Sequence, residues 1–120
     1  MIVFLDAFSR YLFPFFVQDQ KEAARCLKEF VAFAERQSGH KVLAIHSDNA
    51  KEYIEGSFAA FCCEHGIEQQ ITAPYSSSSN GLVEHVLRTI QENGLASLHH
   101  AKLSIGFWPE AFAFVCYTCN

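Results

Sequence analysis

Two carboxylates in this chain stand where they could share a metal ion. Asp48 follows a short apolar run, Val42–Ile45, that is typical of a buried strand, and Glu84 stands near the start of an expected helix. Thirty-five residues separate the two, enough for a helix, a strand and a loop that bring the chain back. Paired carboxylates are the ligands that a two-metal phosphoryl-transfer site uses. Mg²⁺ suits them, because it takes one or two carboxylates and keeps several waters.

Each carboxylate also has an ordinary structural explanation. Asp48, with Asn49 beside it, would form a turn, since both side chains hydrogen-bond to nearby backbone groups. Glu84 in the first turn of a helix would complement the positive end of the helix dipole. The residue types alone leave both interpretations open.

The elements that must position these carboxylates alternate along the chain. We expect strands at residues 1–6, 10–17, 41–46 and 67–72. We expect helices from the Asp19–Glu22 capping sequence to Gly39, from a Ser57 cap to Gly66, from near Asn80, and from Trp108 with Pro109 in its first turn. Residues 73–81, rich in serine, should form a flexible loop. The order β-β-α-β-α-β-α-α indicates a mixed sheet flanked by helices.

Composition limits the classes of protein that this chain can be. Its 120 residues are 50% hydrophobic and 18% charged, which favours one globular domain with a packed core. The net charge of −4 gives no general attraction for nucleic acid, so a polyanion would need a local patch, metal ions or other segments. No apolar stretch is long enough to span a membrane, and the first residues do not have the pattern of a signal peptide.

The five cysteines show no regular spacing. Their odd number favours reduced thiols in an intracellular protein. Cys116 and Cys119 form a single C-x-x-C in an apolar run, which is more often core packing than a metal or redox site. The histidines have no ligand spacing with the cysteines, so we expect them to be surface or packing residues.

Four segments together resemble one protein family. They are FLDAFSRY (4–11), HSDNAKEY (46–53), APYSSSSNGLVEHVLRTI (73–90) and FWPEAF (107–112). In this order they resemble the catalytic core of retroviral-type integrases, most closely those of copia-type retrotransposons. The resemblance covers essentially the whole chain and includes the Asp-to-Glu interval.

The resemblance implies a fold and a metal site. The expected fold is a ribonuclease H-like mixed α/β sheet flanked by helices. Residues 1–120 would be part of the catalytic core, cut at both ends and lacking the first strand, which would leave an open sheet edge beside residues 1–6. The family holds Mg²⁺ or Mn²⁺ with two Asp and one Glu, and Asp48 and Glu84 would be the second and third of these. The first would precede residue 1, because Asp6 falls on the second strand, where the family's Asp is structural or forms a turn.

The resemblance also implies contacts with DNA. Tyr75 and Asn80 fall in the loop that the family uses to handle the viral DNA end, although a turn or cap role would explain them equally well. Arg88 matches a basic residue that would contact a DNA phosphate, and an ion pair with Glu84 four residues earlier is compatible with that. Ser77–Ser79 and His85 depart from the family pattern, which has Pro and Gln in the loop and Arg after the Glu.

The implied function is DNA integration. As part of a retrotransposon polyprotein, the chain would belong to a nuclear, homo-oligomeric integrase that joins element ends to target DNA. Water or a DNA 3′-hydroxyl would attack a phosphodiester. The alternatives are an inactive remnant or a co-opted nucleic-acid-binding domain and, less favoured, a ribonuclease H-like nuclease. Because the first Asp is missing, residues 1–120 alone should show little strand transfer.

Overall fold

A computed structural model of the chain describes residues 1–48, 50–71 and 77–120, with the side chains of 77–80 left out. These residues divide into two compact units. Unit 1 comprises residues 1–2 and 17–80, and unit 2 comprises residues 3–16 and 81–120.

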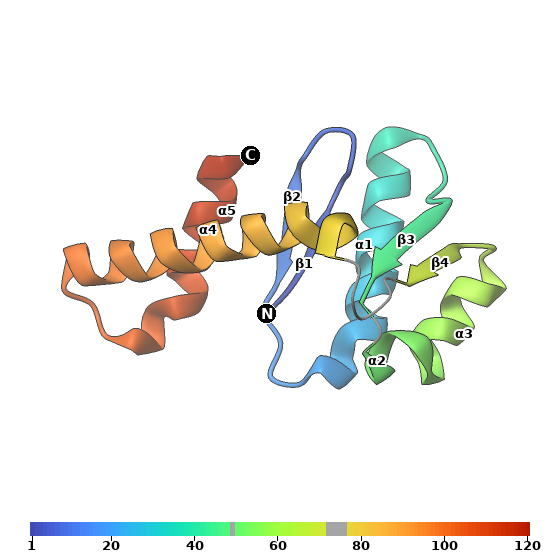
Figure 1. Ribbon diagram of the computed structural model, residues 1–120, viewed down its shortest axis with the longest axis horizontal. Helices are drawn as coiled ribbons and strands as arrows, with labels where there is room; N and C mark the ends of the chain where they lie inside the picture. The colour runs from blue at the N-terminus through green and yellow to red at the C-terminus, as the bar shows by residue number, and fades with distance from the viewer. Residues whose placement is uncertain (49, 72–76) are drawn as a thin grey trace. The chain divides into compact units, whose positions relative to one another are not determined.

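The elements follow the expected order (Figure 1). They are β1 (Ile2–Leu5), β2 (Leu12–Phe15), α1 (Ala23–Ser38), β3 (Ala44–Ser47), α2 (Lys51–Ile54), α3 (Gly56–Glu64), β4 (Glu68–Ile71), α4 (Ser77–Ala101) and α5 (Trp108–Cys119). Two 3-10 turns, η1 (Gln20–Glu22) and η2 (Ile105–Phe107), lead into α1 and α5. The order read from the sequence is confirmed, and the short helix α2 is the addition.

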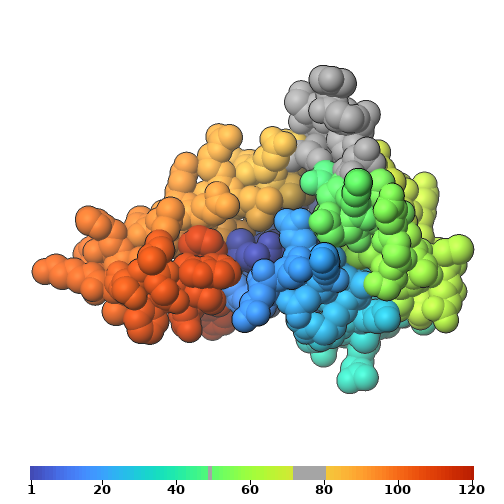
Figure 2. Space-filling view, turned by 90° about the horizontal axis from the view of Figure 1, so that it is seen from below, coloured from blue at the N-terminus to red at the C-terminus, as the bar shows by residue number. Residues whose placement is uncertain are grey.

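Unit 1 is built on a parallel pair of strands. β3 and β4 lie in register from Ala44 opposite Glu68 to Ser47 opposite Ile71. Helices α1, α2 and α3 pack together, as the light-blue and green side chains of Figure 2 show. The core under them is apolar and fully enclosed. Its most buried residues are Ala23, Cys26, Leu27, Val31, Phe58 and Cys62.

Helix α1 has the ends that the sequence predicts. Asp19 Oδ1 accepts a hydrogen bond from the Lys21 N–H (3.0 Å), and Glu22 Oε2 accepts one from the Gln18 N–H (3.2 Å). These side chains start η1, which continues into α1. At the other end Gly39 adopts φ +70°, a left-handed conformation that costs glycine little, and its N–H donates to the Glu35 carbonyl.

The predicted Ser57 cap is wrong. Helix α3 begins at Gly56, so Ser57 lies inside it, and Glu55 holds the cap position without a side-chain hydrogen bond. The reason is the break between α2 and α3, where Gly56 adopts φ +69°. A left-handed glycine lets the chain turn sharply there, one residue earlier than a serine cap would. Gly66, at φ +66°, follows the end of α3 as expected.

Unit 2 packs aromatic side chains between the β1–β2 hairpin and the chain's last helix. Phe4 meets Phe15 edge to face, with ring centroids 5.6 Å apart, and Phe16 meets Trp108 in the same way at 5.7 Å. Figure 1 shows α5 returning toward β2, where it ends. Ile90, Leu98, Val115 and Cys116 are buried in this unit.

The long helix α4 starts earlier than the sequence predicts. The sequence predicts a loop over residues 73–81 and a helix from near Asn80, but α4 already includes Ser77, and residues 73–76 lie outside the described part of the chain. Serine is a weaker helix former than alanine, but by no more than about 0.7 kcal/mol per residue, so an adjacent long helix can extend through it. The helix has Val86 and Leu87 half-buried and Ile90 fully buried, whereas Val83 is exposed. None of the helices in the described ranges is long and apolar enough to cross a membrane.

Candidate metal and nucleic-acid site

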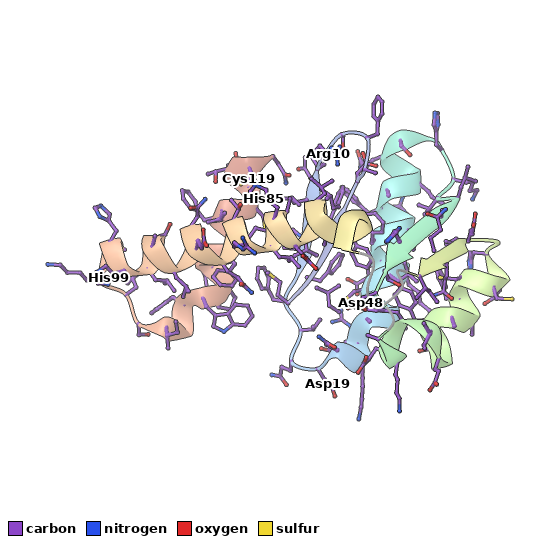
Figure 3. The ribbon with its side chains drawn as sticks, in the orientation of Figure 1. Arg10, Asp19, Asp48, His85, His99 and Cys119 are labelled. Atoms are coloured by element: carbon purple, nitrogen blue, oxygen red, sulfur yellow. The ribbon has the colours of Figure 1, made fainter. Side chains whose placement is uncertain are left out.

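Asp48 lies at the end of β3 in unit 1 (Figure 3). The strand ends at Ser47, and Asp48 Oδ1 accepts a hydrogen bond from the Ala50 N–H at 3.1 Å. This bond forms the turn that leads into α2, which confirms the structural interpretation of the residue. The side chain is exposed, and its other oxygen, Oδ2, has no hydrogen-bond partner among the residues described. One carboxylate can therefore form the turn and still offer an oxygen to a ligand.

The charge of Asp48 affects the pKa of Tyr53, a residue of α2. Burial raises the pKa of Tyr53, and the negative charge of Asp48 raises it further. Tyr53 is held in place by its ring contact with Phe58 at 5.2 Å and by Gln69, whose Nε2 donates to the Tyr53 carbonyl at 2.6 Å. These contacts of α2 with β4 and α3 thus hold Tyr53 in place.

Glu84 lies well inside α4 rather than in its first turn. Counted from Ser77, it stands seven residues into the helix, about two turns from the start. The first turn of α4 contains no acidic residue, so the helix-dipole explanation for Glu84 is wrong, because that effect fades beyond one turn. The side chain is exposed to solvent. A long helix therefore presents this carboxylate on a rigid backbone.

Arg88 follows Glu84 by one turn of α4 and is also exposed. The ion pair that this spacing permits does not form: the salt bridges of the described side chains are Arg25–Glu22, Arg25–Glu29 and Lys41–Glu35. The guanidinium of Arg88 and the carboxylate of Glu84 therefore both face solvent without pairing to each other. His85 lies between them on the same helix (Figure 3).

The two predicted loop residues have different outcomes. Tyr75 lies outside the described residues. The backbone of Asn80 belongs to α4, three residues after Ser77, so Asn80 does not cap this helix.

The predicted ligands fall in different units. Asp48 belongs to unit 1, whereas Glu84 and Arg88 belong to unit 2. Within the described part of the chain, no group of three or more His, Cys, Asp and Glu side chains gathers in a way that could hold a metal ion. The pairing of Asp48 with Glu84 remains a prediction.

Asp6 forms a turn. Its Oδ2 accepts hydrogen bonds from the Ser9 N–H, at 2.8 Å, and from the Ser9 hydroxyl. These bonds from Ser9 hold the pKa of the Asp6 carboxyl below its usual value. The Asp6 carbonyl also accepts from the Arg10 N–H at 2.8 Å, which closes the β1–β2 turn. This is the turn-forming role that the resemblance assigned to it.

All five cysteines are free thiols. Cys26, Cys62 and Cys116 are buried, and burial raises the pKa of each thiol. Cys119 is exposed at the end of α5, so the C-x-x-C places only one of its thiols in the core. His65 stacks on Phe61 with ring centroids 4.1 Å apart, which makes it a packing residue.

Sequence reasoning missed one polar contact in unit 2. The amide side chain of Asn120 bonds to both backbone groups of Leu12, which lies 108 residues earlier. A contact between residues so far apart in the sequence cannot be predicted from a local sequence pattern. The one sequence signal near this contact is Tyr11, the residue before Leu12 and the last residue of the FLDAFSRY segment.

Comparison with known proteins agrees with the resemblance. A family model described as "Integrase core domain" matches residues 1–77, a range that contains Asp48 and stops short of Glu84. Over 119 residues, 99% of the chain, it is 34% identical to the Retrovirus-related Pol polyprotein from transposon TNT 1-94 of Nicotiana tabacum. It is 29% identical over the same length to the corresponding polyprotein from transposon RE1 of Arabidopsis thaliana. The chain spans only 9% and 8% of these two polyproteins.

Solved structures share the fold. The catalytic core domain of BIV integrase matches 98% of this chain and 72% of its own, with a TM-score of 0.71 and 20% identity. A chain of the simian T-cell lymphotropic virus intasome in complex with PP2A regulatory subunit B56 gamma matches 98% of this chain and 41% of its own, with a TM-score of 0.76 and 22% identity. The ribonuclease H-like class is thereby confirmed, and the chain belongs to the integrase core domain family of retrotransposon Pol polyproteins.

Proposed function

We propose that this chain contributes to a retrotransposon integrase whose catalytic divalent metal ion is held by Asp48 and Glu84. The observation that carries the proposal is the position of Asp48. It follows the parallel strand β3 directly, and only one of its carboxylate oxygens is engaged in the turn. Ligands of open α/β sheets bind beyond the carboxyl ends of the strands. Family membership supports DNA integration as the activity.

The donor chemistry of these residues fits Mg²⁺ or Mn²⁺. Both side chains are exposed carboxylates, which are hard oxygen donors. Mg²⁺ takes one or two carboxylates and keeps its remaining positions for water and substrate phosphate. When bound, such an ion supplies Lewis-acid stabilisation of the phosphate charge that develops during displacement.

In the proposed reaction, an oxygen of water or of a DNA 3′-hydroxyl forms a bond to the phosphodiester phosphorus. The bond from phosphorus to the leaving sugar oxygen breaks, and that oxygen gains a proton as the attacking oxygen loses one. Asp48 is oriented for this by its bond to Ala50, and Glu84 by its place inside α4. Arg88, one turn further along, would neutralise a phosphate of the bound DNA. Tyr75 and Asn80 are proposed to handle the DNA end.

The setting of this activity is also a proposal. The partners would be the ends of the element DNA and the target DNA, and the integrase would act as a homo-oligomer in the nucleus. A chain of a solved intasome shares this fold, which supports the assembly.

Strand-transfer assays on the full-length integrase test this function. Asp48→Asn and Glu84→Gln keep the size of each side chain and remove its charge, so each should reduce Mg²⁺-dependent joining by at least about 100-fold, since the charge of the ligand is lost. Glu64→Gln and Glu92→Gln are the controls, because they remove exposed carboxylates of α3 and α4 that we do not place in the site.

The alternatives predict other outcomes. Undiminished joining by either ligand variant would overturn the metal assignment. A full-length protein that binds DNA yet never joins it, with or without the substitutions, would favour a co-opted binding domain. His85 favours that alternative, because it stands where the family has a permanently charged arginine.

A further inference from the structure

Unit 2 contains a shallow hollow between the start of β2 and the end of α5. Its volume is about 490 Å³, and it is lined by Tyr11, Tyr117, Thr118 and Asn120. Tyr117 is 80% exposed and Tyr11 is 47% exposed, so both rings meet solvent over a large part of their surface. None of the four lining side chains carries a formal charge at neutral pH. Two of the four are aromatic, so the hollow offers aromatic surface to a ligand.

Asn120 makes one wall of this hollow rigid. Its Oδ1 accepts from the Leu12 N–H at 2.7 Å, and its Nδ2 donates to the Leu12 carbonyl at 2.9 Å. The amide thus occupies both backbone groups that β2 would offer to an added strand at this point. An occupant of the hollow must therefore bind through its side groups and not by strand pairing at Leu12.

The β1–β2 turn, which precedes Tyr11 in the chain, carries two further exposed side chains, Phe8 and Arg10. Phe8 at the turn is 96% exposed, so its ring does not pack against the rest of unit 2 as aromatic residues usually do. Arg10 adopts φ +65°, a conformation that non-glycine residues rarely keep without support. The support comes from Asp6, whose carbonyl accepts the Arg10 N–H at 2.8 Å. Figure 3 shows Arg10 in this turn.

The turn carries one exposed cation, Arg10, and one carboxylate, Asp6. The Asp6 carboxylate keeps its negative charge and accepts two hydrogen bonds from Ser9 within the turn. The guanidinium of Arg10 is exposed and takes part in none of the salt bridges among the described side chains. Tyr11, next in the chain, is fixed against Phe13 with ring centroids 4.8 Å apart. Aromatic rings that alternate with a cation are the pattern of single-strand nucleic-acid surfaces.

We propose that Phe8, Tyr11 and Tyr117, with Arg10, form an aromatic surface that binds an unpaired DNA strand. Bases stack on the rings, and Arg10 contacts a phosphate. Both amide groups of Asn120 are engaged with Leu12, and the Thr118 hydroxyl donates to the Val115 carbonyl at 2.9 Å. Few donors thus remain to read a base edge, so binding should tolerate any sequence. The choice of DNA as the occupant rests on the proposed function.

Fluorescence anisotropy with a labelled oligothymidylate of about 12 nucleotides measures this binding. At low salt the 120-residue chain should bind the single strand more tightly than the matching duplex. Phe8→Ala and Tyr117→Ala should each weaken binding at least about fivefold, because each removes one stacking platform. Tyr117→Phe keeps the ring and should retain binding. Phe33→Ala, an exposed aromatic of α1, is the control for a general loss of apolar surface.

Arg10 has a matched control in the same unit. Lys102 is a cation that also adopts a left-handed conformation, at φ +55°, and does not line the hollow. Asparagine tolerates that conformation, so Arg10→Asn and Lys102→Asn change the charge with little backbone strain. Arg10→Asn should reduce the slope of log K against log salt concentration by about 0.7, the value of one single-strand phosphate contact, and Lys102→Asn should not.

Crosslinking identifies the surface directly. Oligonucleotides that carry 5-iodouracil should crosslink on irradiation to Tyr11, Tyr117 or Phe8, as peptide mass spectrometry would show. Failure of the chain to bind the single strand, or crosslinks confined to other residues, would overturn the proposal. The proposal would also be overturned if Phe8→Ala and Tyr117→Ala kept DNA binding but dissociated an oligomer in sedimentation. The surface would then be a protein contact. The assay is run in EDTA without divalent metal, so its outcome does not depend on metal binding by Asp48 and Glu84.

Discussion

The ring of Phe112 occupies the space that a side chain at Gly94 would need. A Cβ atom built on Gly94 would lie 2.2 Å from Phe112 Cδ1 and 2.5 Å from its Cε1, well inside van der Waals contact. Phe112 cannot easily move aside, because its ring packs against Trp108 with centroids 5.5 Å apart. Glycine at this position is what lets α5 approach α4 so closely.

Gly94→Ala should therefore destabilise the chain despite the better helix propensity of alanine. The added methyl group overpacks the contact between α4 and α5, which should lower the free energy of unfolding by about 1–3 kcal/mol. Gly81→Ala is the matched control: it lies in the same helix, and an added Cβ there meets nothing within 4 Å. It should stabilise the chain by about 0.5–1 kcal/mol. Urea denaturation of both variants measures the difference, and equal shifts of the same sign would contradict the prediction.

The Asn120 contact with Leu12 should contribute to the stability of unit 2. Leu12 is buried, so loss of the amide leaves its N–H and carbonyl without these partners. Asn120→Ala should lower the free energy of unfolding by about 1–3 kcal/mol, the combined value of two such hydrogen bonds. Asn93→Ala, an exposed amide of α4, is the comparison and should change it little. If Asn120→Ala and Asn93→Ala had the same melting temperature, water would replace the hydrogen bonds of Asn120 without loss of stability.

The contrast between Gly39 and Asn120 shows which features the sequence could predict. The ends of α1 follow from neighbours in the chain, Asp19, Glu22 and Gly39, and these were predicted correctly. The start of α4 and the contact of Asn120 were not, because helix extension through weak formers and a contact over 108 residues depend on the folded environment. Likewise, Glu84 was correctly placed on a helix, but its depth in α4 could not be predicted without the true start of that helix.

Glu35 should make stability depend on pH. It accepts hydrogen bonds from the Val42 N–H at 3.0 Å and from Lys41 Nζ at 3.2 Å, and the bond from Val42 is the main cause of its lowered pKa. A carboxyl whose pKa is lower in the folded state stabilises that state when ionised. The stabilisation is complete above the pKa of an unfolded glutamate, about 4.3, and is lost as pH falls through the lower folded-state pKa.

Glu35→Gln should therefore be less stable than the parent chain at neutral pH, and the difference should shrink in acid. Denaturation in urea at pH values from neutral to about 3 measures it. Glu64→Gln removes an exposed carboxylate of α3 and provides the reference for a general charge effect. A difference between Glu35→Gln and the parent chain that stays constant over this range would show that the ionised carboxylate is not the source.

Asp48 combines a turn and a proposed metal ligand, and two substitutions separate these roles. Asp48→Asn keeps a side-chain oxygen that can accept from the Ala50 N–H, whereas Asp48→Ala removes it. The alanine variant should therefore lose about 0.5–1.5 kcal/mol of stability, and the asparagine variant should lose little.

Metal binding should not follow the same order. Both substitutions remove the negative charge, so in the full-length integrase both should weaken Mg²⁺ binding, as calorimetric titration would show. If only Asp48→Ala lowers stability while both variants weaken Mg²⁺ binding, then the hydrogen bond sets the stability and the charge sets the affinity. The Asp48 carboxylate would then have two functions. If Asp48→Asn retained the Mg²⁺ affinity of the parent protein, the side chain would be a turn former alone, and the metal assignment of β3 would have to be abandoned.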